Sequence, residues 1–418
     1  MRPRLRLALL LLPLALMLAA LLDTPFHLLW DGELVGILRS AVAPKFSVRS
    51  FWNGTYQTEF EAWLEQQLSP KALMVRSDNT LNLVLFREIS AHTGVPIVLG
   101  KRHALFEMNY VNNLNAVSEF KGDPPPRTAY SVEESVRLMA RAARAFQLIR
   151  MDFMVVFYPV KAVIWSDRVR PSFRLPGGAE KAAAGYASLL NRLRAAGVPV
   201  VDGAATFSEI AREKPNFPLY NSGGTHWTDA GACEVSKQVL GAMTHANITG
   251  VALRCRHGKS LPATGDDIDI ASLINVWDDS WFMDPVPGVV PQLSAPLHGG
   301  PRNAWIVGTS YSDGLARELT QAGVFDKVKR SSYYRHSDVN KLDWKRLLNT
   351  HPVVIFEQWQ WSYLTVNLTE FVDDLSTQSP RFAKALRQID ADDAASAAAL
   401  APPAPAVPVA PPSPPSPP

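Results

Sequence analysis

The sequence lacks several features that would point to particular classes of protein. Its 418 residues include only two cysteines, too few for a disulfide scaffold or for a metal site built from thiolates. The formal net charge is only +3, and no basic stripe interleaved with aromatic residues occurs, so nothing favours a nucleic-acid-binding protein. A polyanionic substrate is neither required nor excluded by this charge.

Acidic residues are common in one segment but do not form a recognisable site. Their spacing does not follow that of a calcium-binding loop, so we interpret the segment as a solvated loop and predict no metal and no cofactor. No pair of carboxylates stands out as a glycosidase pair either. The six residues concerned are Asp266, Asp267, Asp269, Asp278, Asp279 and Asp284.

A long hydrophobic run is found only at the N-terminus. Three arginines precede an apolar stretch from Leu7 to Leu22, which is interrupted by Pro13 and ended by Asp23. The run is shorter than the roughly 20 residues of a transmembrane helix, but no A-x-A cleavage site precedes Asp23. We expect residues 1–22 to be an uncleaved signal anchor in the inner membrane, with a cleaved signal peptide as the alternative. Both place the following chain in the periplasm.

Export gives the two cysteines a second possible meaning. Cys233 and Cys255 could form a disulfide in an oxidising periplasm, which would stabilise the fold by roughly 3 kcal/mol. Two separate buried thiols fit the sequence equally well, because free cysteine is among the most buried residue types.

Strand-like and helical patterns alternate along the exported part. Apolar runs at 153–158, 198–201, 304–307 and 353–356 read as buried strands, and helices are expected at 131–146, 179–196 and 230–242. This alternation predicts an α/β fold with a parallel sheet flanked by helices. Ligands of such sheets bind beyond the carboxyl ends of the strands, where Lys161, Asp202 and Ser310 are expected to share one rim.

Two short motifs suggest a nucleophile and its base. Ser310, in Gly308-Thr309-Ser310-Tyr311-Ser312, follows a strand and precedes a helix expected from Leu315, so backbone N–H groups could hold an oxyanion there. His226 lies just before the helix 230–242, whose N-terminus is expected to lower the pKa of the imidazole and keep it neutral. Each motif alone has a plainer interpretation, as a loop serine or a packed histidine.

The two motifs together resemble those of a known family. The chain is similar to the SGNH-hydrolase-like O-acetyltransferases of bacterial exopolysaccharides, the alginate acetylation proteins of the AlgJ and AlgX type. In that family an Asp-Thr-His-Trp motif precedes a Gly-Thr-Ser-(Tyr/Phe)-Ser motif, which reverses the usual SGNH order. Thr225-His226-Trp227 and Gly308–Ser312 stand in that order here, and segments such as Phe51-Trp52-Asn53-Gly54 and Pro159-Val160-Lys161 look like the family's lead-in.

The resemblance, which covers roughly residues 45–390, implies a fold and an activity. It implies an SGNH-like domain over residues 23–390 that adds acetyl groups to hydroxyls of an exported, alginate-like polysaccharide through an acetyl-serine intermediate. Acetyl-CoA is cytoplasmic, so the family implies a membrane-bound O-acyltransferase as the partner that delivers the acetyl group. A periplasmic acetylesterase and a catalytically weak polysaccharide-binding subunit are the alternatives.

One position departs from the family pattern. The family's aspartate, two residues before the histidine, is Gly224 in this chain, and glycine cannot orient the imidazole. Asp202 and Asp229 are the nearest candidates in sequence for that role, with Asp229 the weaker because it opens a helix. A serine–histidine dyad is the alternative, and Tyr311 and Lys161 are further candidates for a supporting role.

Aromatic residues near these motifs could form the substrate surface. We expect Trp227, Trp359 and Trp361 to offer faces on which sugar rings stack, although any one of them could equally lie in the core. From residue 391 the chain is almost wholly Ala, Pro, Ser and Val, so residues 391–418 are expected to be a disordered tail.

Overall fold

The computed structural model describes most of the chain between residues 42 and 400. Among the described residues, no helix combines the length and the apolar character that a membrane crossing requires. The predicted anchor, residues 7–22, lies outside the described residues except for a few isolated positions, and residues 401–418 lie outside them entirely. The described ranges are 34–36, 42–67, 71–89, 96–115, 132–243, 251–297, 303–332, 348–350, 352–359 and 367–400, with single residues between 11 and 23.

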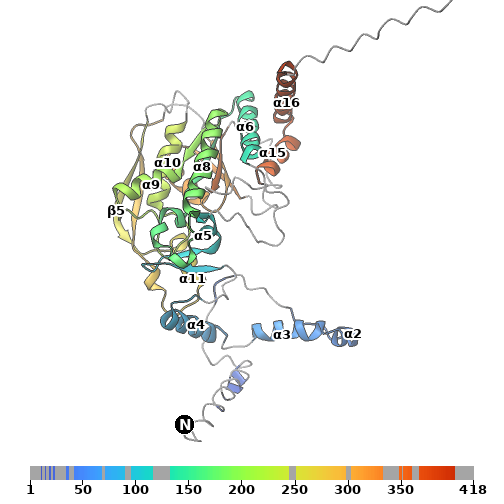
Figure 1. Ribbon diagram of the computed structural model, residues 1–418, viewed down its shortest axis with the longest axis vertical. Helices are drawn as coiled ribbons and strands as arrows, with labels where there is room; N and C mark the ends of the chain where they lie inside the picture. Colours follow the sequence, from blue (N-terminus) through green and yellow to red (C-terminus); the bar gives the residue numbers. More distant parts are fainter. Residues whose placement is uncertain are drawn as a thin grey trace, which may run out of the picture.

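A five-stranded parallel sheet forms the centre of the molecule (Figure 1), which confirms the predicted α/β fold. Its strand order is β4-β3-β9-β7-β8, so β9, which comes last in the sequence, lies in the middle between β3 and β7. The strands are β3 (Phe153–Tyr158), β4 (Val200–Asp202), β7 (Asn303–Gly308), β8 (Lys327–Ser332) and β9 (Val353–Trp359).

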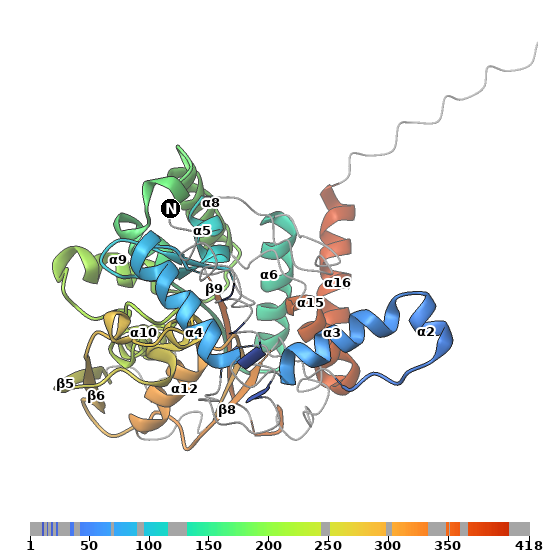
Figure 2. The same cartoon turned by 90° about the horizontal axis from the view of Figure 1, so that it is seen from below.

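Side chains of the central strands alternate between two hydrophobic cores. Ile306 and Ile355 face one core, and Trp305 and Val354 face the other, because successive residues of a strand point to opposite sides. Helices α10 (Asp229–Ala242) and α12 (Ser312–Gln321) cover the first face. The second face is covered by α6 (Val132–Leu148), α8 (Gly178–Ala195), α15 (Asn367–Gln378) and α16 (Pro380–Leu400), as Figures 1 and 2 show.

Two antiparallel hairpins and several short helices complete the fold. One hairpin joins β1 (Ile97–Leu99) to β2 (Leu105–Glu107). With α11 (Asp269–Leu273) it shares a small core that includes Leu105, Ile270 and Phe282. The other hairpin joins β5 (Leu253–Leu261) to β6 (Val286–Leu293), and the remaining helices are α5 (Met108–Leu114), α7 (Lys161–Ile164) and α9 (Gly203–Glu213).

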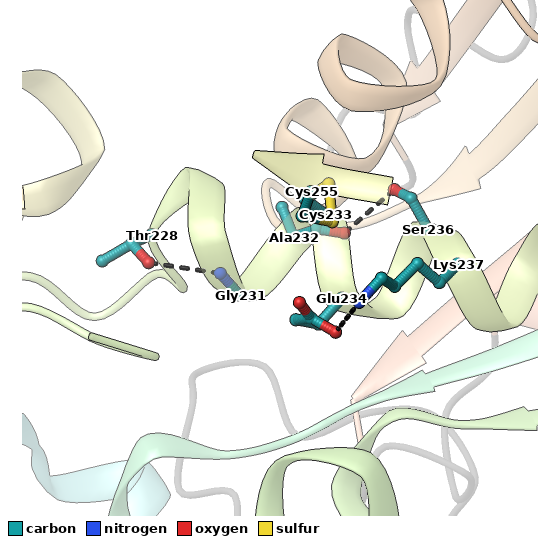
Figure 3. The surroundings of a disulfide bond; sticks show 8 residues. All are labelled: Thr228, Gly231, Ala232, Cys233, Glu234, Ser236, Lys237 and Cys255. Carbon is teal, nitrogen blue, oxygen red and sulfur yellow. Dashed lines mark hydrogen bonds and ion pairs between the residues drawn. A yellow bond between two sulfur atoms is a disulfide. The ribbon is translucent and has the colours of Figure 1, made fainter. Parts of the chain in front are cut away.

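The two cysteines form a disulfide, which selects one of the two interpretations that the sequence left open. Cys233 lies on α10 and Cys255 on β5, with 6.0 Å between their Cα atoms (Figure 3). The bond therefore fastens the β5–β6 hairpin to a helix of the first sheet face.

The N-terminal helices lie apart from the sheet. Figure 1 shows α2 (Val48–Trp52) and α3 (Thr55–Gln67) extending away from the body, while α4 (Lys71–Leu81) and a π-helical turn (Asn82–Phe86) lie beneath it. Helices α2 and α3 are separated at Gly54, whose φ of 82° is unfavourable for residues with a side chain.

The C-terminal helix is longer than expected. Helix α16 continues to Leu400, so residues 391–400, which we assigned to the disordered tail, are helical. Alanine is the best helix former and dominates this stretch, whereas the prolines that would stop a helix begin only at Pro402. The expected boundary at 391 therefore lies inside a helix.

Candidate active site

Ser310 lies in the turn between the central strand β7 and helix α12. Strand β7 ends at Gly308 and α12 begins at Ser312, three residues before the expected start at Leu315. The Ser310 side chain is exposed, and its Oγ lies 2.6 Å from Nε2 of His226. The turn thus presents the hydroxyl at the carboxyl end of the sheet, as the motif predicts.

His226 lies in the loop that leads into α10. Thr228 caps this helix by accepting a hydrogen bond from the N–H of Gly231, which confirms the expected helix start. The imidazole is largely buried and its ring centroid lies 4.6 Å from that of Tyr311. Packing and capping together fix the ring so that Nε2 faces Ser310.

Asp269 occupies the position of the orienting carboxylate. Its Oδ2 lies 2.9 Å from Nδ1 of His226, and its Oδ1 accepts a hydrogen bond of 2.7 Å from the N–H of Thr225. Asp269 opens α11, and the N–H of Ala271 in that helix donates to the carbonyl oxygen of Gly223 at 2.8 Å. Interpreting Asp269 as part of a solvated loop was therefore wrong, because α11 is bonded to the histidine loop.

The electrostatics of His226 differ from the sequence-based expectation. Burial alone lowers the pKa of the imidazole, but the hydrogen bond and the negative charge of Asp269 outweigh it, and the net effect raises the pKa. The expected influence of the helix N-terminus is thus overcome by a carboxylate. An acceptor at Nδ1 favours the tautomer with its proton there, which leaves Nε2 able to take the proton of Ser310.

Gly224 gives room to the loop that carries Asp269. A Cβ at position 224 would lie 2.6 Å from the carbonyl oxygens of both Asp266 and Asp267. Any side chain here would push that loop away from His226. Glycine at position 224, where the family has an aspartate, therefore leaves the space that lets Asp269 reach His226.

Neither aspartate proposed from the sequence takes the orienting role. Asp202 caps α9, where its Oδ1 accepts hydrogen bonds from Ala205 N and from the hydroxyl of Tyr186. Asp229 forms an ion pair with Arg317 of α12. The side chains of both aspartates therefore bond to other groups and do not orient His226.

Lys161 follows β3, as expected, but its side chain is buried and does not face the rim. Its Nζ donates to the carbonyl oxygens of Asn221 at 2.7 Å, Ser222 at 3.0 Å and Gly224 at 2.6 Å, and lies 2.9 Å from that of Leu105. Burial lowers the pKa of this lysine to about 7. Lys161 thus ties the loop before His226 to the β1–β2 hairpin.

Tyr311 links the two halves of the site. Its hydroxyl donates to the carbonyl oxygen of Thr225 at 2.5 Å, and its ring stacks on Tyr158 with centroids 3.9 Å apart. Burial raises its pKa well above the ordinary value, so the phenol stays protonated. Tyr311, which follows Ser310, therefore holds Thr225, which precedes His226, in place.

The expected aromatic substrate surface is only partly described. Trp227 is 3% exposed and packs against Tyr158 and Phe207, so the interpretation as a sugar-stacking face was wrong: a sugar ring cannot reach a ring in the core. The side chains of Trp359 and Trp361 lie outside the described residues. In the part of the chain that is described, no group of three or more His, Cys, Asp and Glu side chains is arranged to hold a metal ion.

Sequence reasoning missed Asp269 because the signal was diffuse. Six aspartates occur between residues 266 and 284, and nothing in their spacing distinguishes one of them. The only hint was indirect, since a histidine motif without its aspartate required a carboxylate from elsewhere.

Comparisons with known proteins agree with the motifs. Residues 119–326 match the model of a family described as an SGNH hydrolase-like domain, acetyltransferase AlgX. This segment contains Ser310, His226 and Asp269, and the match confirms the resemblance that the two motifs indicate. No curated protein matches the chain in the corresponding comparison.

Several solved structures are similar to the chain. One is Pseudomonas aeruginosa AlgX, at 18% identity over 63% of this chain and 62% of that chain, with a TM-score of 0.45. The chain thus spans less than two thirds of the length of AlgX. The O-acetyltransferase domain of Pseudomonas putida AlgJ is 18% identical over 70% of this chain and 99% of that one, with a TM-score of 0.42. Bacillus cereus PatB1 is 10% identical over 66% and 99%, with a TM-score of 0.39.

Proposed function

We propose that this protein, an acyltransferase whose residues 119–326 belong to the SGNH hydrolase-like AlgX acetyltransferase family, transfers acetyl groups to hydroxyls of an exported polysaccharide. The observation that carries the proposal is the continuous chain of hydrogen bonds from Asp269 through His226 to Ser310. Such a chain is the arrangement that activates a serine for acyl transfer, because it combines a nucleophile, a base and a group that orients the base.

The first half of the reaction forms an acetyl-enzyme. Ser310 Oγ attacks the acetyl carbonyl carbon while His226 Nε2 takes the hydroxyl proton, and Asp269 stabilises the imidazolium. The donor that we assign to the oxyanion of the tetrahedral intermediate is the backbone N–H of Ser310, because the neighbouring N–H groups of Thr309, Tyr311 and Ser312 already donate to the Glu357 carboxyl, the Thr309 hydroxyl and the Thr309 carbonyl oxygen. The intermediate collapses when the bond to the leaving group breaks, and His226 returns the proton to that group.

The second half passes the acetyl group to the acceptor. A sugar hydroxyl gives its proton to His226 and attacks the acetyl-serine, and the ester bond to Ser310 Oγ breaks as His226 protonates it. Water in place of the sugar would complete the same cycle as an esterase. Lys161 and Tyr311 support both halves by positioning the His226 loop.

The location and the donor follow from the same proposal. Structural disulfides persist in oxidising compartments, so the Cys233–Cys255 bond supports a periplasmic site of action. There the acetyl group has to be delivered across the membrane, for which we propose a membrane-bound O-acyltransferase as partner. If residues 7–22 are an uncleaved anchor, the protein sediments with inner membranes and keeps Met1 or Arg2; a soluble form starting near Asp23 would refute the anchor.

A donor–acceptor experiment tests the activity. The protein is incubated with a chromogenic acetyl ester, with and without a deacetylated oligosaccharide, and both chromophore release and acetylated sugar are measured, with Ser310→Ala as the control. We expect acetylated sugar to form only with the unaltered serine. Turnover to acetate alone would establish an esterase, and sugar binding without either reaction would establish a binding subunit.

A further inference from the structure

A buried glutamate lies directly beneath the nucleophile turn. Glu357, on β9, is 0% exposed, and its Oε2 accepts a hydrogen bond of 2.6 Å from the backbone N–H of Thr309, the residue before Ser310. Both carboxyl oxygens also lie 3.1 Å from the hydroxyl of Thr309. Side chains alternate along β9, so Glu357 lies on the sheet face that α12 covers, on the same side as Ile355.

The rest of the turn is built around this carboxyl group. A Cβ at position 308 would lie 2.1 Å from Oε2 of Glu357, so the motif needs glycine there. The N–H of Tyr311 donates to the Thr309 hydroxyl at 3.2 Å, and Arg330 donates to the Thr309 carbonyl oxygen at 3.1 Å. The backbone on both sides of Ser310 is therefore held through Thr309.

We propose that Glu357 is a positioning residue, which through Thr309 holds Ser310 Oγ in line with His226 Nε2. The inference rests on the proposed function, in that Ser310 is taken to be the nucleophile. A buried polar group with this many partners fixes one conformation of the turn, and a displacement of about 1 Å at a nucleophile can reduce its reactivity about 10²-fold.

The protonation state of Glu357 gives the proposal a distinctive signature. Burial raises the pKa of Glu357 to about 8, against the lowering effects of its hydrogen bonds with Thr309 and of the charges on Arg330 and His226. Among the described residues, Arg330 from β8 and His226 from the loop before α10 are the charged or titratable groups that act most strongly on Glu357. As the pH rises through about 8, Glu357 acquires a negative charge, which favours the imidazolium that forms when Ser310 attacks. Serine reactivity should therefore rise further above neutral pH.

The test measures the reactivity of Ser310 without acetyl donor or sugar. Phenylmethylsulfonyl fluoride reacts with an activated serine: the oxygen–sulfur bond forms, fluoride leaves and the hydroxyl proton passes to the base. The rate is followed by intact mass between about pH 6 and pH 9, for the parent protein and for Glu357→Gln and Glu357→Ala. Thermal unfolding of each variant is recorded in parallel.

We expect Glu357→Gln, which keeps the shape and the hydrogen bonds of the neutral acid, to react like the parent at neutral pH. It should keep the rise caused by deprotonation of His226 but lose the further alkaline rise near pH 8. Glu357→Ala should react about 10²-fold more slowly, with the half-saturating probe concentration unchanged. Glu318→Gln is the matched control, because Glu318 is also buried with a pKa raised to about 8, but it faces Asp229 and Arg317. It should keep the alkaline rise.

A further rise near pH 8 that persists in Glu357→Gln, beyond the rise caused by deprotonation of His226, would overturn the proposal, as would a folded Glu357→Ala variant with the parent's rate. If the alanine variant does not fold, the glutamine variant alone decides. Failure of the parent protein to react with phenylmethylsulfonyl fluoride would also count against the proposed role of Glu357. Normal sulfonylation without sugar acetylation would instead refute the transferase function and leave the role of Glu357 intact.

Discussion

Replacing Asp269 by asparagine perturbs the site with little change in shape. The amide oxygen can still accept the hydrogen bond from the N–H of Thr225, but an NH2 group then faces Nδ1 of His226, where the carboxylate accepted at 2.9 Å. Because this NH2 group is a donor, it forces the imidazole proton onto Nε2. That nitrogen can then no longer take the proton of Ser310.

The expected loss follows from this change of tautomer. In serine hydrolases the same substitution reduces kcat about 10⁴-fold, which corresponds to about 5.5 kcal/mol in the activation free energy. We expect a loss of this order for Asp269→Asn, because His226 and Asp269 are both largely shielded, with side chains 12% and 29% exposed. A water molecule has little room to replace the carboxylate.

The pH profile gives a second, independent measure. In the parent protein Asp269 outweighs burial and raises the pKa of His226, so acylation is lost as the pH falls through this raised value. Without the carboxylate, burial lowers the pKa of His226, and the acidic limb of the residual activity should move to lower pH.

Burst kinetics of acetyl-enzyme formation with a chromogenic ester, recorded against pH, measure both effects. The matched control is Asp266→Asn, since Asp266 lies in the same loop and acts on His226 by charge alone. We expect that variant to retain most of the activity. A rate for Asp269→Asn within about tenfold of the parent, or an equal loss in both variants, would refute the assignment of Asp269.

Three further predictions concern the nucleophile, the glycine and the disulfide. Ser310→Ala should abolish the acetyl adduct seen by intact mass and reduce turnover by several orders of magnitude without unfolding; an adduct that persists would contradict the role of Ser310. Gly224→Asp should lower acetyl transfer, because its Cβ would collide with the backbone of Asp267 and displace the acidic loop; equal or higher transfer would show that position 224 tolerates the family's carboxylate. Replacing Cys233 and Cys255 by serine should reduce the free energy of unfolding by about 3 kcal/mol in denaturant titrations, and an unchanged midpoint would contradict this.

The sheet was predictable because its strands are fully buried. β3 is buried along its whole length, and such a strand reads as an unbroken apolar run whose limits the sequence displays directly. Helix α10 was also predictable, since a threonine cap marks its start. For both elements, residues close together in the sequence were enough to predict the structure.

Only part of the site could be predicted from the sequence. Ser310 and His226 lie in short motifs that can be recognised locally, whereas Asp269 reaches His226 only through the packing of α11 against the β1–β2 hairpin. For Lys161 and Trp227, sequence position suggested the wrong role. Their places beside a strand end and a catalytic motif suggested exposed roles, but tertiary packing buries both.

The wide spacing of the three active-site residues has a consequence for how the protein acquires activity. His226 is separated from Asp269 by 43 positions and from Ser310 by 84, and the three residues lie in different segments, the loop before α10, the first turn of α11 and the turn after β7. Closing such loops requires the sheet to be complete, because β7 pairs with β8 and β9 on either side. In refolding, helical signal should therefore return before Ser310 regains its reactivity, so the reactive serine reports the last stage of folding and not its beginning.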